Sequence, residues 1–229
     1  MGSVDLDSSI LREWLVPYLW VLPIVIVVAL VCLGIALGFV TNRRRSDAFA
    51  SALGDSTRSR LRWLQPPGSR GFAALFAPAP APFVELAVAF RAATRFSPLD
   101  LLAHILHLRR QEMHLHGKLE AIPTEQIIWL RSGTPSRAVG RGSSTTLWVQ
   151  RRLDFVNGEY AVQGANTRAL EHRFSELQTR FGTFLDVVRV QADGPSHVEV
   201  ILHTTGLNSE EIPAFVATIR NLARAALQQ

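Results

Sequence analysis

The chain opens with a long apolar stretch. Residues 16 to 40 are twenty-five consecutive positions without a charge, and a helix of that length, at about 1.5 Å per residue, spans roughly 37 Å. A hydrocarbon core of roughly 30 Å requires less. The acidic Asp5, Asp7 and Glu13 before the stretch do not fit a cleavable signal peptide, and buried helices of soluble proteins rarely stay uncharged on every face. The pattern predicts a transmembrane helix at 16–40 after a short extracytoplasmic segment, 1–15.

A second pattern begins at residue 83, where apolar and polar positions alternate with a period of two. Val84, Leu86, Val88 and Phe90 are the apolar members, which predicts a strand. Ser97 has the position and chemistry of a helix N-cap, with proline at the next position. The first half is predicted to contain a strand at 83–92, a helix at 97–110 and strands at 112–121 and 126–131.

The second half follows the same order after a polar loop at 132–144. We expect strands at 145–155 and 158–164 around Asn157 and Gly158, a helix capped by Asn166 with Leu170, Phe174, Leu177 and Phe181 on one face, a hairpin at 186–205 turning at Asp193 and Gly194, and a last helix capped by Asn208 with Glu211 at N3. The fold class is α+β: a mainly antiparallel or mixed sheet with helices on one face. The repeated strand-helix-strand-strand order is typical either of a duplication or of a common α+β solution.

Residues 41–82 are predicted to connect the anchor to the domain at 83–229. Residues 46–65 fit an amphipathic helix on the membrane surface or a helical spacer, because apolar side chains stand among polar ones. Residues 66–82 are rich in proline, alanine and glycine, which indicates an extended connector. Its "FAALF" segment fits a docking patch or a loop packed on the domain core.

Charge sets the expected orientation. The chain has a formal net charge of +5, and residues 41–64 hold six arginines against two aspartates. Positive charge beside a span favours the cytoplasmic side, so we expect the N-terminus outside and the domain in the cytoplasm. Basic residues there attract anionic lipid headgroups. The predicted membrane-surface residues are Arg43, Arg44, Arg45, Arg58, Arg60, Arg62 and Trp63.

Histidines give the best candidate for a metal site. His104, His107, His114 and His116 lie within thirteen positions, and imidazole suits zinc and other transition ions. Their spacing is not that of a conventional zinc site, and on a strand His114 and His116 would share the solvated side of a sheet. We therefore expect no bound metal and no other cofactor, and treat the four as weak candidates only.

The sequence carries no catalytic signature. It has no Walker-type glycine loop and no serine elbow, and Cys32, its only cysteine, falls in the apolar stretch. Paired arginines such as Arg151 and Arg152 would point to opposite faces of a strand, which disfavours a nucleic-acid groove. A non-enzymatic protein with no nucleic-acid partner is expected, and the pattern disfavours a small-molecule ligand.

The layout resembles that of the calumin-like proteins of the PAT complex. The shared features are the acidic N-terminus, one span, a basic neck and a domain in which a helix, "LDVVRVQ", a hairpin, "HVEVILHTTG" and a final helix follow one another. Eukaryotic members help newly made multipass membrane proteins, so the resemblance implies a role in membrane-protein biogenesis. The chain lacks the long acidic luminal segment and charged coiled tail of that family, and a separate bacterial membrane family fits equally well.

These observations favour a membrane-anchored scaffold, assembly factor or accessory subunit that contacts the lipid bilayer and integral membrane proteins. The neck from Arg43 to Trp63 is its predicted contact surface. A subunit of a respiratory or transport complex would need the same features. The alternative from another class is a membrane-bound sensor of a small ligand or metal that uses the histidine cluster.

Overall fold

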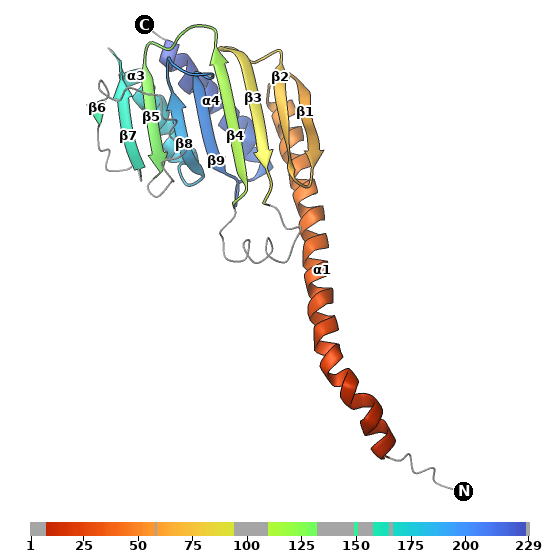
Figure 1. Ribbon diagram of the computed structural model, residues 1–229. Coiled ribbons are helices and arrows are strands. Elements are labelled where there is room, and N and C mark those ends of the chain that lie inside the picture. The colour runs from red at the N-terminus through yellow and green to blue at the C-terminus, as the bar shows by residue number, and fades with distance from the viewer. Residues whose placement is uncertain are drawn as a thin grey trace.

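The first element is a helix that extends far beyond the expected span. The computed structural model describes residues 8–57, 59–93, 110–131, 149–150, 158–164 and 167–227. Helix α1, Ser8–Thr57, forms a stem that carries the domain on its C-terminal end (Figure 1). It is the one helix in the described ranges that is long and apolar enough to cross a membrane, and only 6% of its most apolar window is buried. A core helix of a soluble protein would be mostly buried there.

The domain is built on one sheet. The described strands are β1 Arg60–Gly68, β2 Gly71–Ala77, β3 Phe83–Arg91, β4 Glu112–Leu119, β5 Gln126–Arg131, β6 Val149–Gln150, β7 Gly158–Gln163, β8 Leu185–Val190 and β9 Val198–His203. They lie in the order β1-β2-β3-β4-β9-β8-β5-β7-β6. Every described pair is antiparallel. This confirms the predicted α+β class.

Two helices cover one face of the sheet. Helix α3, Arg168–Phe181, and helix α4, Ile212–Leu227, pack on each other and on the same side of the strands, while the opposite side forms the face turned to the viewer in Figure 1. The predicted stripe of α3 is buried in full. Asn208 and Glu211 form the predicted capping box, around a short 3₁₀ turn at Ser209–Glu211 that precedes α4.

The expected connector at 66–82 is wrong, because most of it belongs to the sheet. β1 and β2 form an antiparallel pair, and β2 also pairs with β3. The "FAALF" segment is the middle of β2, where Phe72, Ala74 and Phe76 are buried. Pro66 and Pro67 argue against a strand in the sequence because proline has no backbone N–H to donate. An edge strand such as β1 tolerates them, since one of its sides forms no ladder hydrogen bonds.

The position of strand β3 was predicted correctly, but Val84 lies on the other face of the sheet from the one predicted. Leu86, Val88 and Phe90 of β3 are buried as expected, whereas Val84 is 65% exposed and Phe83 is buried. The register shifts between Phe83 and Glu85. A bulge adds one residue to the strand and so reverses the alternation beyond it.

Several predictions fall outside the described residues, namely the helix at 97–110 except Arg110, the loop at 132–144, the turn residue Asn157, the cap Asn166 and all of the 145–155 strand except β6. The N-cap of α3 is Thr167. The two halves are paired differently, because β3 lies beside β4 whereas β5 separates β7 from β8. The sheet order therefore gives no support to a duplication.

Candidate functional site

The C-terminal part of α1 is joined to the domain by polar bonds. Asn42 is 1% exposed, and its Nδ2 donates to the carbonyl oxygen of Ala93 at 2.8 Å while its Oδ1 accepts from Nε2 of Gln111 at 3.2 Å. One turn later, Oγ of Ser46 donates to the carbonyl oxygen of Gly68 at 2.7 Å. Buried polar groups that are satisfied in this way fix geometry, because breaking one leaves an unpaired group in the interior.

Apolar side chains on the following turns enter the hydrophobic core. Phe49, Ala50 and Leu53 are at most 5% exposed and belong to the main core cluster. The Phe49 ring lies edge-on to Phe90 of β3, with centroids 5.2 Å apart. This part of α1 is therefore a core helix of the domain, and both expectations for residues 46–65, a surface helix and a simple spacer, are wrong.

The predicted membrane-surface residues that the structure describes separate into three groups. Arg43 and Arg44 are exposed on α1. Arg45 is half-buried and donates to the carbonyl oxygens of Thr204 and Leu207, so it holds the domain to α1. Arg58 lies outside the described residues, and the remaining three, Arg60, Arg62 and Trp63, are exposed on the edge strand β1.

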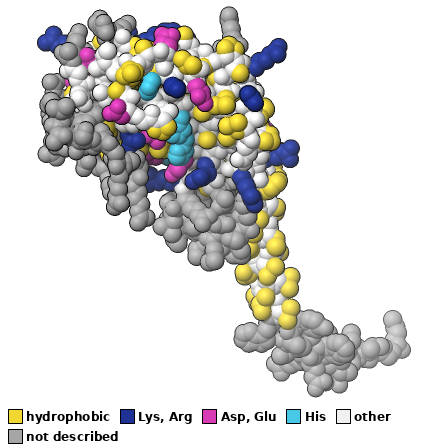
Figure 2. All heavy atoms as spheres, turned by 45° about the horizontal axis from the view of Figure 1, so that its top comes forward, with side chains coloured by type: hydrophobic (Ala, Val, Ile, Leu, Met, Phe, Trp, Pro, Cys, Tyr) yellow, Lys and Arg dark blue, Asp and Glu magenta, His cyan; other side chains and the backbone are white. Residues whose placement is uncertain are grey.

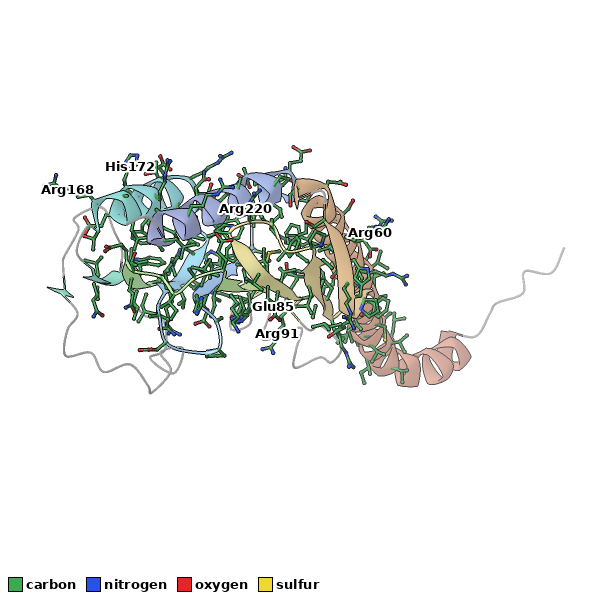
Figure 3. The ribbon with its side chains drawn as sticks, turned by 90° about the horizontal axis from the view of Figure 1, so that it is seen from above. Arg60, Glu85, Arg91, Arg168, His172 and Arg220 are labelled. Atoms are coloured by element: carbon green, nitrogen blue, oxygen red, sulfur yellow. The ribbon has the colours of Figure 1, made fainter. Side chains whose placement is uncertain are left out.

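Position along α1 places β1 residues at different distances from the apolar span. Thr57 follows Val40 by seventeen positions, or about 25 Å of helix. Arg60, at the start of β1, points outward near the end of α1 (Figure 3), while Gly68, at the end of β1, is bonded to Ser46. β1 thus runs back toward the span, and Arg60 lies at its far end rather than at the level of Arg43.

A shallow groove of about 600 Å³ separates α1 from β1. Asp47, Ser51 and Asp55 line it from the helix, and Arg60 and Trp63 line it from the strand. The sequence shows both walls only as scattered polar residues. The contact between α1 and β1 brings them together, and the mixed lining gives no defined chemistry.

The open face of the sheet carries the histidines that the structure describes. On β4, Met113 and Leu115 are buried against the helices while His114 and His116 lie on the other side, as expected, with ring centroids 6.3 Å apart. Figure 2 shows histidine side chains in a stripe, with carboxylates and basic groups beside them. His104 and His107 lie outside the described residues.

The β4 histidines are paired with neighbouring charges. Nε2 of His114 lies 3.1 Å from Oε2 of Glu112, and this hydrogen bond lowers the pKa of the Glu112 carboxyl. Burial lowers the pKa of His116, although Glu199 across the strand pair opposes that shift. His116 is therefore favoured in its neutral form near neutral pH.

Two arginine–carboxylate pairs extend the stripe across β9, β8 and β5. Nη1 of Arg189 lies 2.5 Å from Oε2 of Glu199, and the two side chains are 9% and 19% exposed. Asp186 lies between Nε of Arg131 at 3.3 Å and Nδ1 of His203 at 3.4 Å. We call this set the histidine–carboxylate stripe: Glu112, His114, His116, Arg131, Asp186, Arg189, Glu199 and His203.

Sequence position alone does not show that His203 belongs to this stripe. His203 is half-buried beside Asp186, and His197 accepts the backbone N–H of Leu119 at its Nδ1, 3.1 Å away. The missing signal was strand order, because β9 lies between β4 and β8. No group of three or more histidines, cysteines or carboxylates with metal-binding geometry occurs in the described ranges.

The stripe is suited to recognition through charge and hydrogen bonds. Its carboxylates are engaged by arginine or histidine, and no nucleophile lies within it. Paired polar groups on the side of a sheet away from its helices give register and specificity to a partner rather than large apolar burial. No protein-family model matches the sequence, and no curated protein matches it significantly.

Proposed function

We propose that this protein is a non-enzymatic membrane-anchored scaffold that serves as an assembly factor or accessory subunit of a membrane protein complex. The observation that carries this proposal is helix α1, which contains an apolar window long enough to cross a membrane and whose C-terminal turns, with Phe49 and Leu53, lie in the domain core. A domain joined in this way cannot swing on a loose linker. The length of α1 between the apolar stretch and the core sets the height of the domain's surfaces above the bilayer.

The proposed orientation has the N-terminus outside and the domain in the cytoplasm. Arg43 and Arg44 are exposed directly after the apolar stretch, and Arg45 stays beside them in a half-buried position. Three positive charges at one end of a span favour the cytoplasmic side. The layout resemblance to calumin-like proteins extends the proposal to membrane-protein biogenesis, with integral membrane proteins as partners.

We further propose that partners dock on the histidine–carboxylate stripe. The face holding the stripe lies opposite α3 and α4, and Figure 3 shows Glu85 and Arg91 pointing away from the helix layer that carries Arg168 and His172. Ala87 and Ala89 of β3 lie opposite His116 and His114 in the ladder. Small residues there leave room for a partner to approach the charged groups.

Site-specific photocrosslinking in native membranes tests this proposal. A photoreactive amino acid replaces Ala89 on the open face of the full-length protein, and the matched control replaces His172, which is exposed on α3. The expected result is reproducible crosslinking of the same integral membrane proteins from position 89 and not from position 172. Equal yields of diffuse products from both positions would contradict the docking face, and no crosslinked protein from either would contradict the scaffold.

The metal-sensor alternative has a direct test. Full-length protein purified in detergent without chelators is expected to contain no stoichiometric transition metal on elemental analysis. A stoichiometric metal that is lost on substitution of His114 and His116 would overturn the non-enzymatic scaffold in favour of a sensor, because these two histidines are adjacent on the open face.

A further inference from the structure

The fold gathers arginines from separate chain segments at the edge of the domain nearest the apolar span. The bonds around Asn42 set this geometry. Asn42 is hydrogen-bonded to Ala93 and to Gln111, and the N–H of Ala92 donates to the carbonyl oxygen of Arg70 at 3.1 Å. Arg91 immediately precedes Ala92 and Arg110 immediately precedes Gln111.

The exposed arginines on the segments joined by these contacts are called the arginine rim. They come from α1, from the turn between β1 and β2, from the end of β3 and from the residue before Gln111, and they are Arg43, Arg44, Arg70, Arg91 and Arg110. Figure 2 shows basic side chains where the apolar stem meets the domain. The last three members are separated from the span by 30 to 70 residues of chain, so only folding brings them there.

The height of the rim matches a headgroup layer. Asn42 and Ser46, which bond the segments holding the rim, follow Val40 by two and six positions, or about 3 to 9 Å along a helix. The polar zone on each side of a hydrocarbon core is about 5 to 8 Å thick. If α1 leaves the hydrocarbon near Val40, the rim lies in the phosphate layer of that leaflet.

Two carboxylates near this edge, Glu112 and Glu211, are hydrogen-bonded to groups outside the rim. Glu112 faces Arg91 across the β3–β4 ladder and is hydrogen-bonded to His114. Glu210 and Glu211 precede α4, on the helix-covered face, where the Glu211 side chain accepts the N–H of Asn208. Arginine recognises phosphate through bidentate hydrogen bonds, which distinguishes it from a general positive charge.

We infer that the arginine rim binds the phosphates of anionic phospholipids in the leaflet from which α1 emerges, and so clamps the membrane-facing edge of the sheet to the bilayer surface. This inference rests on the proposed anchor. A helix alone permits the domain to tilt and rotate with it, whereas contacts from β2, β3 and β4 would fix the direction in which the open face points.

The test measures the height of the rim in reconstituted full-length protein. Cys32→Ala removes the native thiol and Ser69→Cys, beside Arg70, accepts a fluorophore that is quenched by headgroup-labelled lipid. Vesicles consist of phosphatidylcholine alone or with a minority of phosphatidylglycerol. A label at Asp193→Cys, in the exposed turn between β8 and β9 at the opposite end of the strands, reports on nonspecific approach.

The decisive variant is Arg70→Gln, Arg91→Gln and Arg110→Gln together. The matched control, with the same loss of three charges, is Arg60→Gln, Arg62→Gln and Arg168→Gln, all exposed and remote from the rim. Each arginine near an anionic surface shifts a binding equilibrium by about fivefold. The rim variant is therefore expected to lower the ratio of docked to undocked domain by about 100-fold, and the control to leave it nearly unchanged.

Each outcome decides the inference. Stronger quenching at position 69 with phosphatidylglycerol, lost in the rim variant and at high salt but kept in the control, supports the clamp. Equal quenching in both vesicles, or equal loss in both triple variants, overturns it while leaving the anchor intact. Failure of the unsubstituted protein to float with either vesicle after alkaline washing overturns the anchor and the clamp together. Unchanged near-UV circular dichroism confirms that the variants are folded.

Discussion

Leu53→Ala tests whether the end of α1 belongs to the domain core. Leu53 is completely buried and lies in the main core cluster with Phe49 one turn earlier. Deleting a buried leucine side chain removes its transfer free energy and leaves a cavity, which together destabilise a protein by about 3 to 5 kcal/mol. The same change in a spacer helix would alter the free energy of unfolding by about 0.5 kcal/mol or less.

The assay is thermal unfolding of the full-length protein in detergent, followed by near-UV circular dichroism. For a domain of this size, 1 kcal/mol shifts the midpoint by about 2 to 4 °C, so Leu53→Ala should lower it by about 6 to 20 °C. Leu64→Ala is the matched control, because Leu64 is 65% exposed on β1. Equal midpoints for the two variants would refute the conclusion that α1 is part of the core.

Three further changes test the open face and the early strands. Arg189→Met should lower the free energy of unfolding, measured by chemical denaturation, by about 3 kcal/mol. The reason is that the Glu199 carboxylate, which is only 19% exposed, loses its cationic partner. Adding Glu199→Gln should recover part of the loss. Burial lowers the pKa of His116 in the folded state below its ordinary value of 6.5. As the pH falls through 6.5, the unfolded chain therefore binds more protons than the folded one, and the free energy of unfolding decreases. His116→Gln should flatten this dependence of stability on pH. Gly71→Ala should cost more than about 1 kcal/mol by thermal melting, since Gly71 has φ +117° and a Cβ would lie 1.8 Å from the Phe90 carbonyl oxygen.

Local pattern was sufficient wherever one face of an element is apolar. The stripe of α3, the burial of Met113 and Leu115 on β4, and the turn at Gly194 with φ +118° all follow from periodicity and turn chemistry within a few residues. The capping of α4 by Asn208 also follows from a four-residue motif. Such signals depend only on neighbours in the chain.

Local pattern failed where pairing partners decided the structure. The proline, alanine and glycine content of residues 66–82 predicted a connector, but β2 and the end of β1 lie in this segment, and β2 is hydrogen-bonded to both β1 and β3. The end of α1 is amphipathic enough to suit a membrane surface, and only its contacts with the core show which apolar medium it enters. Hydrophobicity measures the free energy of transferring an apolar side chain out of water, and it is the same whether the side chain enters a protein core or a membrane.

The sequence by itself determined that the chain has one apolar helix long enough to span a bilayer, followed by an α+β domain, because length, charge and periodicity are local properties. Only the tertiary structure decided that this helix continues into the core, that strand order assembles the histidine–carboxylate stripe, and that the segments holding Arg70, Arg91 and Arg110 are hydrogen-bonded together around Asn42. Those features depend on contacts between residues distant in the chain. Strand order and helix docking arise from the packing of the whole sheet, which no single segment encodes.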